Sequence, residues 1–186
     1  MLVIIADDLT GALDTAAPFA ARGLRTEVAL TIEAVAEALA LQPDVLSINL
    51  ASREKQKDEA YQLMREVIAR LPPGVRLFKK IDSRLKGHIS AELDAIDYSR
   101  ALMAPAIPAF GRVVKDAHVD GFGVASPISI AQVLGRHAER STIPDVLAQE
   151  DLLAALDECK ADDIDLLVGA RGLAEALAYR MTECAE

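Results

Sequence analysis

Short apolar runs alternate with helical patterns along most of the chain. The first run, LVIIA at residues 2–6, has no polar position and predicts a strand buried on both faces. Further strands are expected at 25–31, 44–50, 75–81, 101–105, 141–146 and 164–170. Helices are expected between them, at 11–23, 32–41, 55–71, 87–99, 150–160 and 172–183. This alternation predicts right-handed crossovers and a mostly parallel sheet.

The expected fold class is α/β, with three layers and helices on both faces of the sheet, in a single domain over residues 1–186. The helix at 11–23 is expected to turn one apolar face inward, formed by Leu13, Ala16, Ala17 and Ala20. Proline, glycine and mixed charge at 106–127 predict a long loop with a small hairpin in HVDGFGV at 118–124, followed by a helix at 128–139. Loops of this length in a compact domain are often functional.

Composition restricts the kind of partner. A formal net charge of −9 over 186 residues argues against a nucleic-acid or anionic-membrane partner, which requires a basic surface. No stretch approaches the roughly 20 apolar residues of a membrane span, and the amino-terminal run is too short for a signal peptide. We therefore expect a cytoplasmic protein, in which a local cluster of positive charge is informative.

Such a cluster, together with carboxylates, follows the expected strands at their carboxyl ends. The residues are Asp7 and Asp8 after the first strand, Ser52 and Arg53 after the third, Lys80, Asp82, Ser83, Arg84 and Lys86 after the fourth, and Gly111 and Arg112 after the fifth. Ligands of open parallel sheets bind outside the carboxyl ends of the strands. The four segments therefore predict one binding site.

The chemistry of these side chains is complementary. Arg53, Lys80 and Arg112 could hold a carboxylate, for which arginine offers a bidentate fork. Asp8 and Asp82 could accept hydrogen bonds from sugar hydroxyls, and either is a candidate to take a proton from an attacking hydroxyl. The expected ligand is small, anionic and hydroxylated.

The helices expected to begin near Gly11 and Gly87 would offer free N–H groups to the same anion.

Simpler roles for several of these residues remain open at this stage. Asp8 or Thr10 could only cap the first helix. Lys80 and Asp82 could form no more than a surface ion pair, and Arg53 could be a solvated charge.

No nucleotide-binding motif is present. The chain has neither a G-x-x-x-x-G-K-[ST] loop nor a G-x-G-x-x-G turn after a strand, and its three histidines show no ligand spacing. We therefore expect this chain alone to bind no cofactor and no metal.

Four segments carry a resemblance to a known family. IADDLTGALDTAAPFAARG, KKIDSRLKGHISAELDA, APAIPAFGR and VGARGLAEALA occur in order and resemble the N-terminal, sugar-acid-binding domain of the four-carbon acid sugar kinases, over about residues 1–180. The resemblance implies phosphorylation of acids such as threonate, erythronate or 3-oxo-tetronate with ATP and Mg²⁺. It also implies that a C-terminal nucleotide-binding domain of the family is absent here. The substrate contacts that it implies are Asp8, Arg53, Lys80, Asp82, Ser83 and Arg112, and with Asp7 and Lys86 from the strand ends these residues make up the expected substrate site.

The chain departs from the family pattern in its ligand-facing loops. Lys86 and His88 stand where the motif S-T-L-R-G-N has arginine and asparagine. Lysine keeps the charge of arginine but loses its fork. These differences bear on which acid is bound.

Several functions remain open from the sequence. The first is the substrate-binding half of a kinase, inactive until a nucleotide-binding partner chain closes the cleft; the second is a stand-alone sugar-acid-binding protein. The chain could also be a fragment of a longer enzyme, and homo-oligomerisation is undecided. A phosphatase or hydrolase that uses Asp7 and Asp8 is disfavoured, because adjacent residues of a strand point to opposite sides.

Overall fold

A seven-stranded parallel sheet forms the centre of the protein. The computed structural model describes residues 1–159 and 163–183. The strand order is β2-β3-β1-β4-β10-β5-β9, and every pairing is parallel. The strands are β1 (Leu2–Ala6), β2 (Thr26–Ala29), β3 (Val45–Asn49), β4 (Arg76–Lys80), β5 (Ala101–Ala104), β9 (Ser141–Thr142) and β10 (Leu166–Gly169). Strands β2 and β3 lie on one side of β1, whereas β5, β9 and β10 lie on the other side of β4, so a topological switch point lies between β1 and β4.

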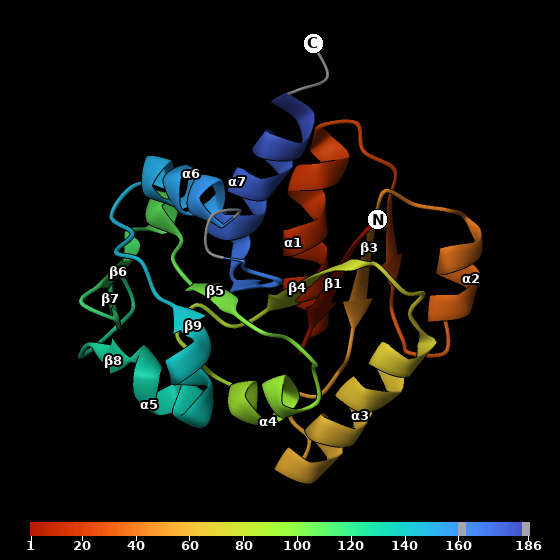
Figure 1. Ribbon diagram of the computed structural model, residues 1–186, viewed down its shortest axis with the longest axis horizontal. Helices are drawn as coiled ribbons and strands as arrows, with labels where there is room; N and C mark the ends of the chain where they lie inside the picture. Colours follow the sequence, from red (N-terminus) through yellow and green to blue (C-terminus); the bar gives the residue numbers. More distant parts are fainter. Residues whose placement is uncertain (160–162, 184–186) are drawn as a thin grey trace.

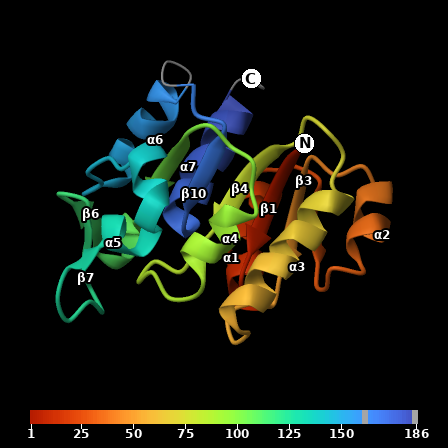
Figure 2. The same cartoon turned by 60° about the horizontal axis from the view of Figure 1, so that its bottom comes forward.

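Helices cover both faces of this sheet (Figure 1). The α-helices are α1 (Leu9–Ala21), α2 (Val35–Ala40), α3 (Lys57–Arg70), α4 (Ile89–Asp94), α5 (Ile130–Leu134), α6 (Gln149–Glu158) and α7 (Arg171–Thr182). Helix α7 packs against α1 and α6 on one face, whereas α3 and α4 lie together in front of the sheet in Figure 2. The predicted three-layer α/β fold is confirmed.

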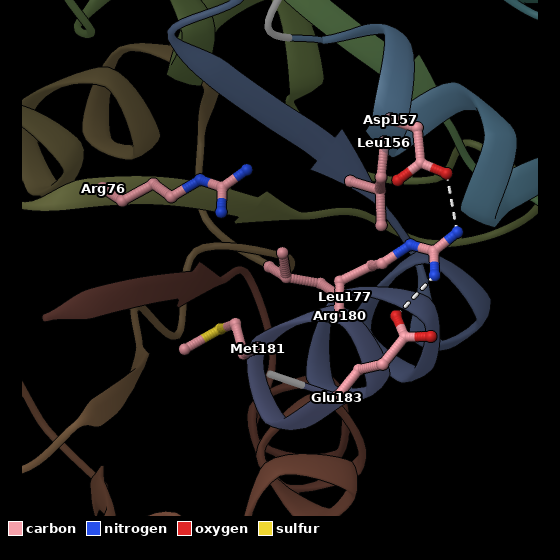
Figure 3. Close-up of a pocket in the computed structure, with 7 residues that line it drawn as sticks. All are labelled: Arg76, Leu156, Asp157, Leu177, Arg180, Met181 and Glu183. Atoms are coloured by element: carbon pink, nitrogen blue, oxygen red, sulfur yellow. Dashed lines mark hydrogen bonds and ion pairs between the residues drawn. The ribbon is translucent and has the colours of Figure 1, made fainter. Parts of the chain in front are cut away.

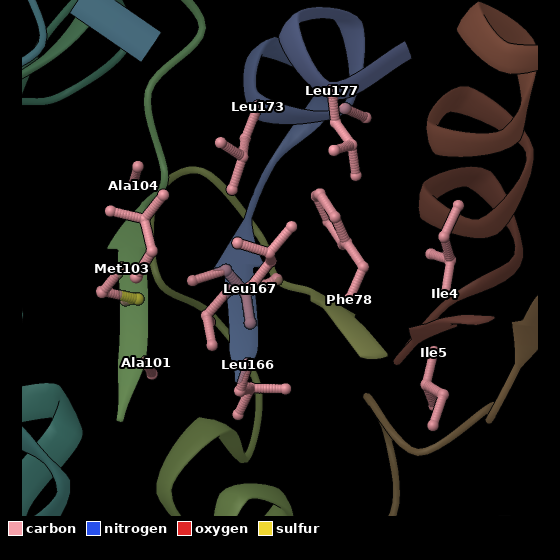
Figure 4. Close-up of a cluster of buried hydrophobic side chains, with 14 of the residues drawn as sticks. Ile4, Ile5, Phe78, Ala101, Met103, Ala104, Leu166, Leu167, Leu173 and Leu177 are labelled. Atoms are coloured by element: carbon pink, nitrogen blue, oxygen red, sulfur yellow. The ribbon is translucent and has the colours of Figure 1, made fainter. Parts of the chain in front are cut away.

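One part of the core lies between α7 and the central strands. In Figure 4, Leu173 and Leu177 of α7 point toward Leu167 of β10 and Phe78 of β4. All four side chains are at most 2% exposed. Burial of a leucine or phenylalanine side chain contributes about 1.5–3 kcal/mol, so these contacts fix the position of α7 on the sheet.

The interruption after β5 is an antiparallel sheet rather than a loop with one small hairpin. Its strands are β6 (Arg112–Lys115), β7 (His118–Gly121) and β8 (Ile128–Ser129), and it lies beyond the β9 edge of the main sheet (Figure 1). The hairpin predicted at 118–124 is therefore misplaced. Its turn is at Asp116 and Ala117, whose φ values of 49° and 58° suit a tight two-residue hairpin turn.

The inward face predicted for α1 is wrong at most positions. Leu13 is 46% exposed, and Ala17 and Ala20 are also exposed. The helix instead buries Ala12, Ala16 and Phe19 against the sheet, together with Gly11 and Thr15. The segment is apolar nearly all round, so periodicity alone did not select the face.

Three other elements are shorter than predicted. The segment 141–146 divides: Ser141–Thr142 pair with β5, while Val146 forms an isolated bridge to Val114 of β6. The helix predicted at 87–99 is confined to α4, which is six residues long. The helix predicted at 128–139 becomes strand β8, helix α5 and the 3₁₀-helix η2 (Gly135–Arg140), and Gly135, with a φ of 57°, marks the break between the two helices.

Candidate functional site

A small polar pocket lies at the carboxyl ends of the central strands. It has a volume of about 150 Å³ and is lined by Asp8, Thr10, Gly11, Asp14, Arg53, Lys80, Asp82, Ser83, Ile107, Phe110, Ala170 and Arg171. These residues follow β1, β3, β4, β5 and β10, so strands far apart in sequence build the site together. The pocket lies beside the switch point between β1 and β4, where open α/β sheets bind their ligands.

A larger hollow lies at the opposite end of the sheet, beside the first residue of β4 and the last turn of α7 (Figure 3). Its volume is about 470 Å³. Arg180 crosses it and makes ion pairs of 2.6 Å with both Asp157 and Glu183. Because the hollow lies away from the carboxyl ends of the strands, where open α/β sheets bind their ligands, we assign the candidate site to the smaller pocket.

Asp7 and Arg53 form a buried ion pair beneath the pocket. Asp7 is 2% exposed and accepts two hydrogen bonds from the Arg53 guanidinium, from Nε and, at 2.8 Å, from Nη2. Burial alone would raise the pKa of Asp7. The Arg53 hydrogen bonds and the charges of Lys79, Arg53 and Lys80 outweigh burial, so this pKa is lowered. Asp7 therefore stays ionised and holds Arg53 in place.

A second buried ion pair supports the first. Lys79 Nζ lies 2.8 Å from Glu92 Oε2, and both side chains are 1% exposed. The hydroxyl of Ser52, which is also buried, donates to Glu92. The backbone N–H groups of Ser52 and Arg53 both donate to the Asp7 carbonyl. These bonds and the bond from Ser52 to Glu92 together fix the loop that carries Arg53.

Asp8 caps α1 and borders the pocket. Its Oδ1 accepts from the backbone N–H of Gly11 at 2.8 Å, so the predicted capping role is confirmed. A side chain at Gly11 would displace two site groups, since an added Cβ would lie 2.6 Å from Asp8 Oδ1 and 3.0 Å from Lys80 Nζ. Glycine at this position therefore leaves room for the ammonium group of Lys80.

Lys80 is 8% exposed, and its ammonium group makes no hydrogen bond or ion pair with any described residue. The surface ion pair with Asp82 is therefore not formed. Burial lowers the pKa of Lys80, against the opposing charges of Asp7 and Asp8. A buried cation without a partner, facing a pocket, favours an anionic ligand.

Asp82 and Ser83 sit on a loop that their own contacts shape. Asp82 Oδ2 accepts from the backbone N–H groups of Arg84 and Lys86 at 3.1 and 3.3 Å. Its Oδ1 lies 4.0 Å from Arg53 Nη1. Arg112 donates to Ser83 Oγ at 2.7 Å, so a residue from the antiparallel sheet positions this hydroxyl.

The backbone of these loops is strained. Leu85 is buried with a φ of 63°, and Ala51, which leads into the Arg53 loop, has a φ of 53°. Left-handed conformations of this kind cost about 1–2 kcal/mol in residues other than glycine. Gly87, with a φ of 94°, packs where an added Cβ would lie 2.5 Å from Asp7 Oδ2. Strained positions of this kind cluster at functional sites.

The structure brings most of the predicted site residues together. Five of them line the pocket, namely Asp8, Arg53, Lys80, Asp82 and Ser83. Asp7 lies beneath the pocket, and Arg112 reaches it through Ser83. Lys86 is exposed and does not line it. The helix expected to begin near Gly87 starts at Ile89, has only six residues, and contributes none of them to the pocket lining.

Sequence reasoning missed Arg171 as a site residue. It is the first residue of α7 and follows β10, the strand between β4 and β5. The strand-end argument, applied to the predicted strand at 164–170, would have found it. Thr10 and Asp14 of α1 and Phe110 of the 3₁₀-helix η1 (Pro108–Phe110) were missed as well.

The fold and this pocket define a small-ligand-binding α/β domain. Residues 2–129 match the family described as the sugar-binding N-terminal domain, and the chain belongs to this family. Among the described residues, no helix is long and apolar enough to cross a membrane, and no group of three or more His, Cys, Asp or Glu side chains could hold a metal ion.

Several proteins of similar sequence are sugar-acid kinases. A D-threonate kinase of Salmonella typhimurium is 30% identical, over 97% of this chain and 54% of that enzyme. A D-threonate kinase of Cupriavidus necator is 36% identical, over 92% of this chain and 43% of the enzyme. A D-erythronate kinase of Heliobacterium modesticaldum is 30% identical, over 95% of this chain and 41% of that enzyme. The chain thus spans about half the length of these relatives.

Solved structures show the same fold. A protein of Bordetella bronchiseptica, crystallised as a domain-swapped dimer with bound citrate, matches with a TM-score of 0.80 and 27% identity, over 95% of this chain and 55% of that chain. A Haemophilus influenzae protein matches with a TM-score of 0.74 and 21% identity, over 98% of this chain and 56% of that chain. The second likeness concerns the fold alone.

Proposed function

We propose that this chain binds a four-carbon sugar acid of the threonate or erythronate type in the pocket at the carboxyl ends of β1, β4 and β10. One observation carries the proposal: in a member of the sugar-binding family, three carboxylates and three cations line one small pocket. The cations are suited to a carboxylate and the aspartates to hydroxyl groups. The citrate bound by the Bordetella protein is likewise a hydroxylated acid.

The size of the pocket supports a small substrate. Its volume of about 150 Å³ lies below the roughly 300–1,000 Å³ of sites for drug-sized ligands. Asp8 and Asp82 are the candidates to accept a proton from the hydroxyl that attacks the phosphoryl donor, because both carboxylates reach the pocket.

We further propose that the chain is the substrate-binding half of an ATP-dependent kinase. ATP and Mg²⁺ would be held by a separate nucleotide-binding domain or partner chain, and both halves would act in the cytoplasm. Phosphoryl transfer depends on positioning and charge neutralisation around both reactants, which half of a cleft does not supply. The chain alone is therefore inactive.

The surface near the pocket supports a closing partner. Leu9 and Leu13 of α1 are 43% and 46% exposed and flank pocket residues of the same helix. Phe110 lines the pocket and is 54% exposed, and Phe122, beside Arg112, is 71% exposed. Large apolar side chains that gather near a site are typical of surfaces covered by another domain.

The test is calorimetric titration of the full chain with D-threonate and D-erythronate, without ATP. We expect one of them to bind, and Asp82→Asn to weaken binding by tenfold or more, about 1.4 kcal/mol. The side-chain oxygen of the introduced asparagine could still accept the backbone hydrogen bonds of the loop. Asp97→Asn is the matched control, since Asp97 is exposed and lies outside the pocket. Equal binding by wild type and Asp82→Asn would place the acid elsewhere.

A coupled assay with ATP and Mg²⁺ tests the second part. The chain that binds the acid should transfer no phosphoryl group when alone. Turnover by the isolated chain would refute the need for a nucleotide-binding half. Nucleotide-binding domains of the family are then added to the chain. If the chain binds the acid but no added domain produces turnover, the result favours a stand-alone sugar-acid-binding protein.

A further inference from the structure

The amino-terminal end of α7 faces the pocket without a cap. Strand β10 ends at Gly169, and Ala170 and Arg171, the N-cap and first residue of α7, both line the pocket. No described side chain caps this twelve-residue helix, and its first turn has no acidic residue. The free N–H groups and the positive end of the helix dipole therefore remain available to an anion.

Helix α1 also starts at the pocket, but its first turn is capped by a side chain. The carboxylate of Asp8 already accepts from the Gly11 N–H, so α1 supplies its own anion. An external carboxylate would be repelled there by Asp8. Of the two helix starts at the pocket, α7 is the one that can receive a ligand anion.

Lys80 provides an independent observation in the same pocket. Its backbone pairs with Gly169 in the sheet, and its ammonium group lies near the start of α1, 3.0 Å from the position that a Cβ on Gly11 would take. The side chain is more than nine-tenths buried, lines the pocket and has no described partner. The charges of Asp7, Asp8 and Asp82 act on this ammonium group, but none of these carboxylates forms a hydrogen bond or ion pair with it. Its N–H donors are therefore left for a ligand carboxylate.

The other cations near the pocket are already engaged. Arg53 donates two hydrogen bonds to Asp7, and Arg112 donates to Ser83 and to the Phe122 carbonyl. Arg171 is held only through Nε, which lies 2.9 Å from Glu175 Oε1, so its terminal Nη groups have no partner among the described residues. Arg53 Nη1 makes no hydrogen bond, but Arg53 is already ion-paired with Asp7, Asp8 and Asp82. Lys80 and Arg171 are thus the cations that remain most available to a ligand.

We infer that the carboxylate of the bound acid lies at the amino-terminal end of α7, between Lys80 and Arg171, with the hydroxylated carbons directed toward Asp8 and Asp82. This inference rests on the proposed function and extends it to the orientation of the substrate. It makes Arg171 a specificity residue that distinguishes a sugar acid from the corresponding polyol. It also assigns Arg53 to positioning rather than to the carboxylate.

The experiment compares three probes on the full chain: D-threonate, its neutral counterpart D-threitol, and inorganic phosphate. Arg171→Gln removes a partly exposed charge and should leave the fold intact. It should weaken D-threonate binding roughly tenfold, the loss of one charge-assisted contact, and leave D-threitol binding unchanged. Lys80→Met, which keeps the length of the buried side chain, should weaken D-threonate binding more strongly. Arg65→Gln, on α3, is the matched control.

Each outcome decides between the two proposals. If the wild type binds neither D-threonate nor D-erythronate, the proposed function and the inference both fail. If the wild type binds D-threonate and Arg171→Gln binds it equally well, the inference alone fails. Equal weakening of D-threonate and D-threitol by Arg171→Gln would also overturn it. Phosphate that binds more tightly than D-threonate and depends on Arg171 would reassign this end of α7 to a phosphoryl group.

Discussion

The ion pair between Asp7 and Arg53 shows how a single carboxylate organises the site. Asp7 accepts from the guanidinium with its side chain and from the backbone N–H groups of Ser52 and Arg53 with its carbonyl. It therefore links the ends of β1 and β3. Removing one partner of a buried pair leaves the other charge without compensation, which is costly. Asp7 thus stabilises the fold while it orients Arg53 beside the pocket.

Asp7→Asn should destabilise the protein in a pH-dependent manner. The pKa of Asp7 in the folded protein lies below its ordinary value of 3.8. Its contribution to stability is therefore present above that value and is lost as the pH falls through the folded pKa. We expect the variant to be about 3 kcal/mol less stable at neutral pH, and this difference to shrink as the pH falls below 3.8. Urea unfolding over a pH series measures this difference.

Asp97→Asn provides the comparison for this titration, since Asp97 is exposed and makes no described hydrogen bond. Its unfolding free energy should follow that of the wild type at every pH. A destabilisation by Asp7→Asn that stays constant down to low pH would contradict the assigned ionisation.

At the scale of elements, α1 has two apolar faces with different environments. Ala12, Ala16 and Phe19 pack on the sheet, whereas Leu9 and Leu13 remain at the surface near the pocket. A helix that is apolar all round is usually buried all round. The exposed face is consistent with the closing partner that we propose.

Stability should depend on one face of α1 only. Phe19→Ala, at a position that is 0% exposed, should lower the free energy of unfolding by about 3–5 kcal/mol. Leu13→Ser, at a position that is 46% exposed, should change it by less than about 0.5 kcal/mol. Chemical denaturation of the two variants measures both values. Similar losses for both would mean that Leu13 is buried in solution, for instance by self-association.

The sequence predicted the central strands and five pocket residues because both follow from local rules. Strands of a parallel sheet are continuous apolar runs, and their carboxyl ends meet at one edge. The pairing of Asp7 with Arg53 did not follow, because it depends on the approach of segments 46 residues apart. The face of α1 and the break near Gly135 likewise depend on tertiary packing. Local patterns therefore predicted residues that line the candidate pocket, whereas tertiary contacts decide which of its charges remain without a partner.

At the scale of the whole molecule, the proposed anion site has to work against the protein's own negative charge. With a net charge of −9, the surface repels an acid at a distance. Attraction must then come from the cations and the helix end gathered at the sheet edge. These groups occur on elements that the core already fixes, so the pocket is largely formed before the ligand arrives.

A preformed pocket predicts that the ligand stabilises the whole domain. A sugar acid at a hundred times its dissociation constant should add about 2.7 kcal/mol, which corresponds to roughly 5–10 °C in Tm for a domain of this size. Differential scanning fluorimetry with D-threonate measures the shift. Arg171→Gln should unfold at the wild-type temperature without ligand and show a smaller shift at the same concentration of acid. A pocket that forms only when a nucleotide-binding half is present would instead show no shift in the isolated chain and a shift once that half is added.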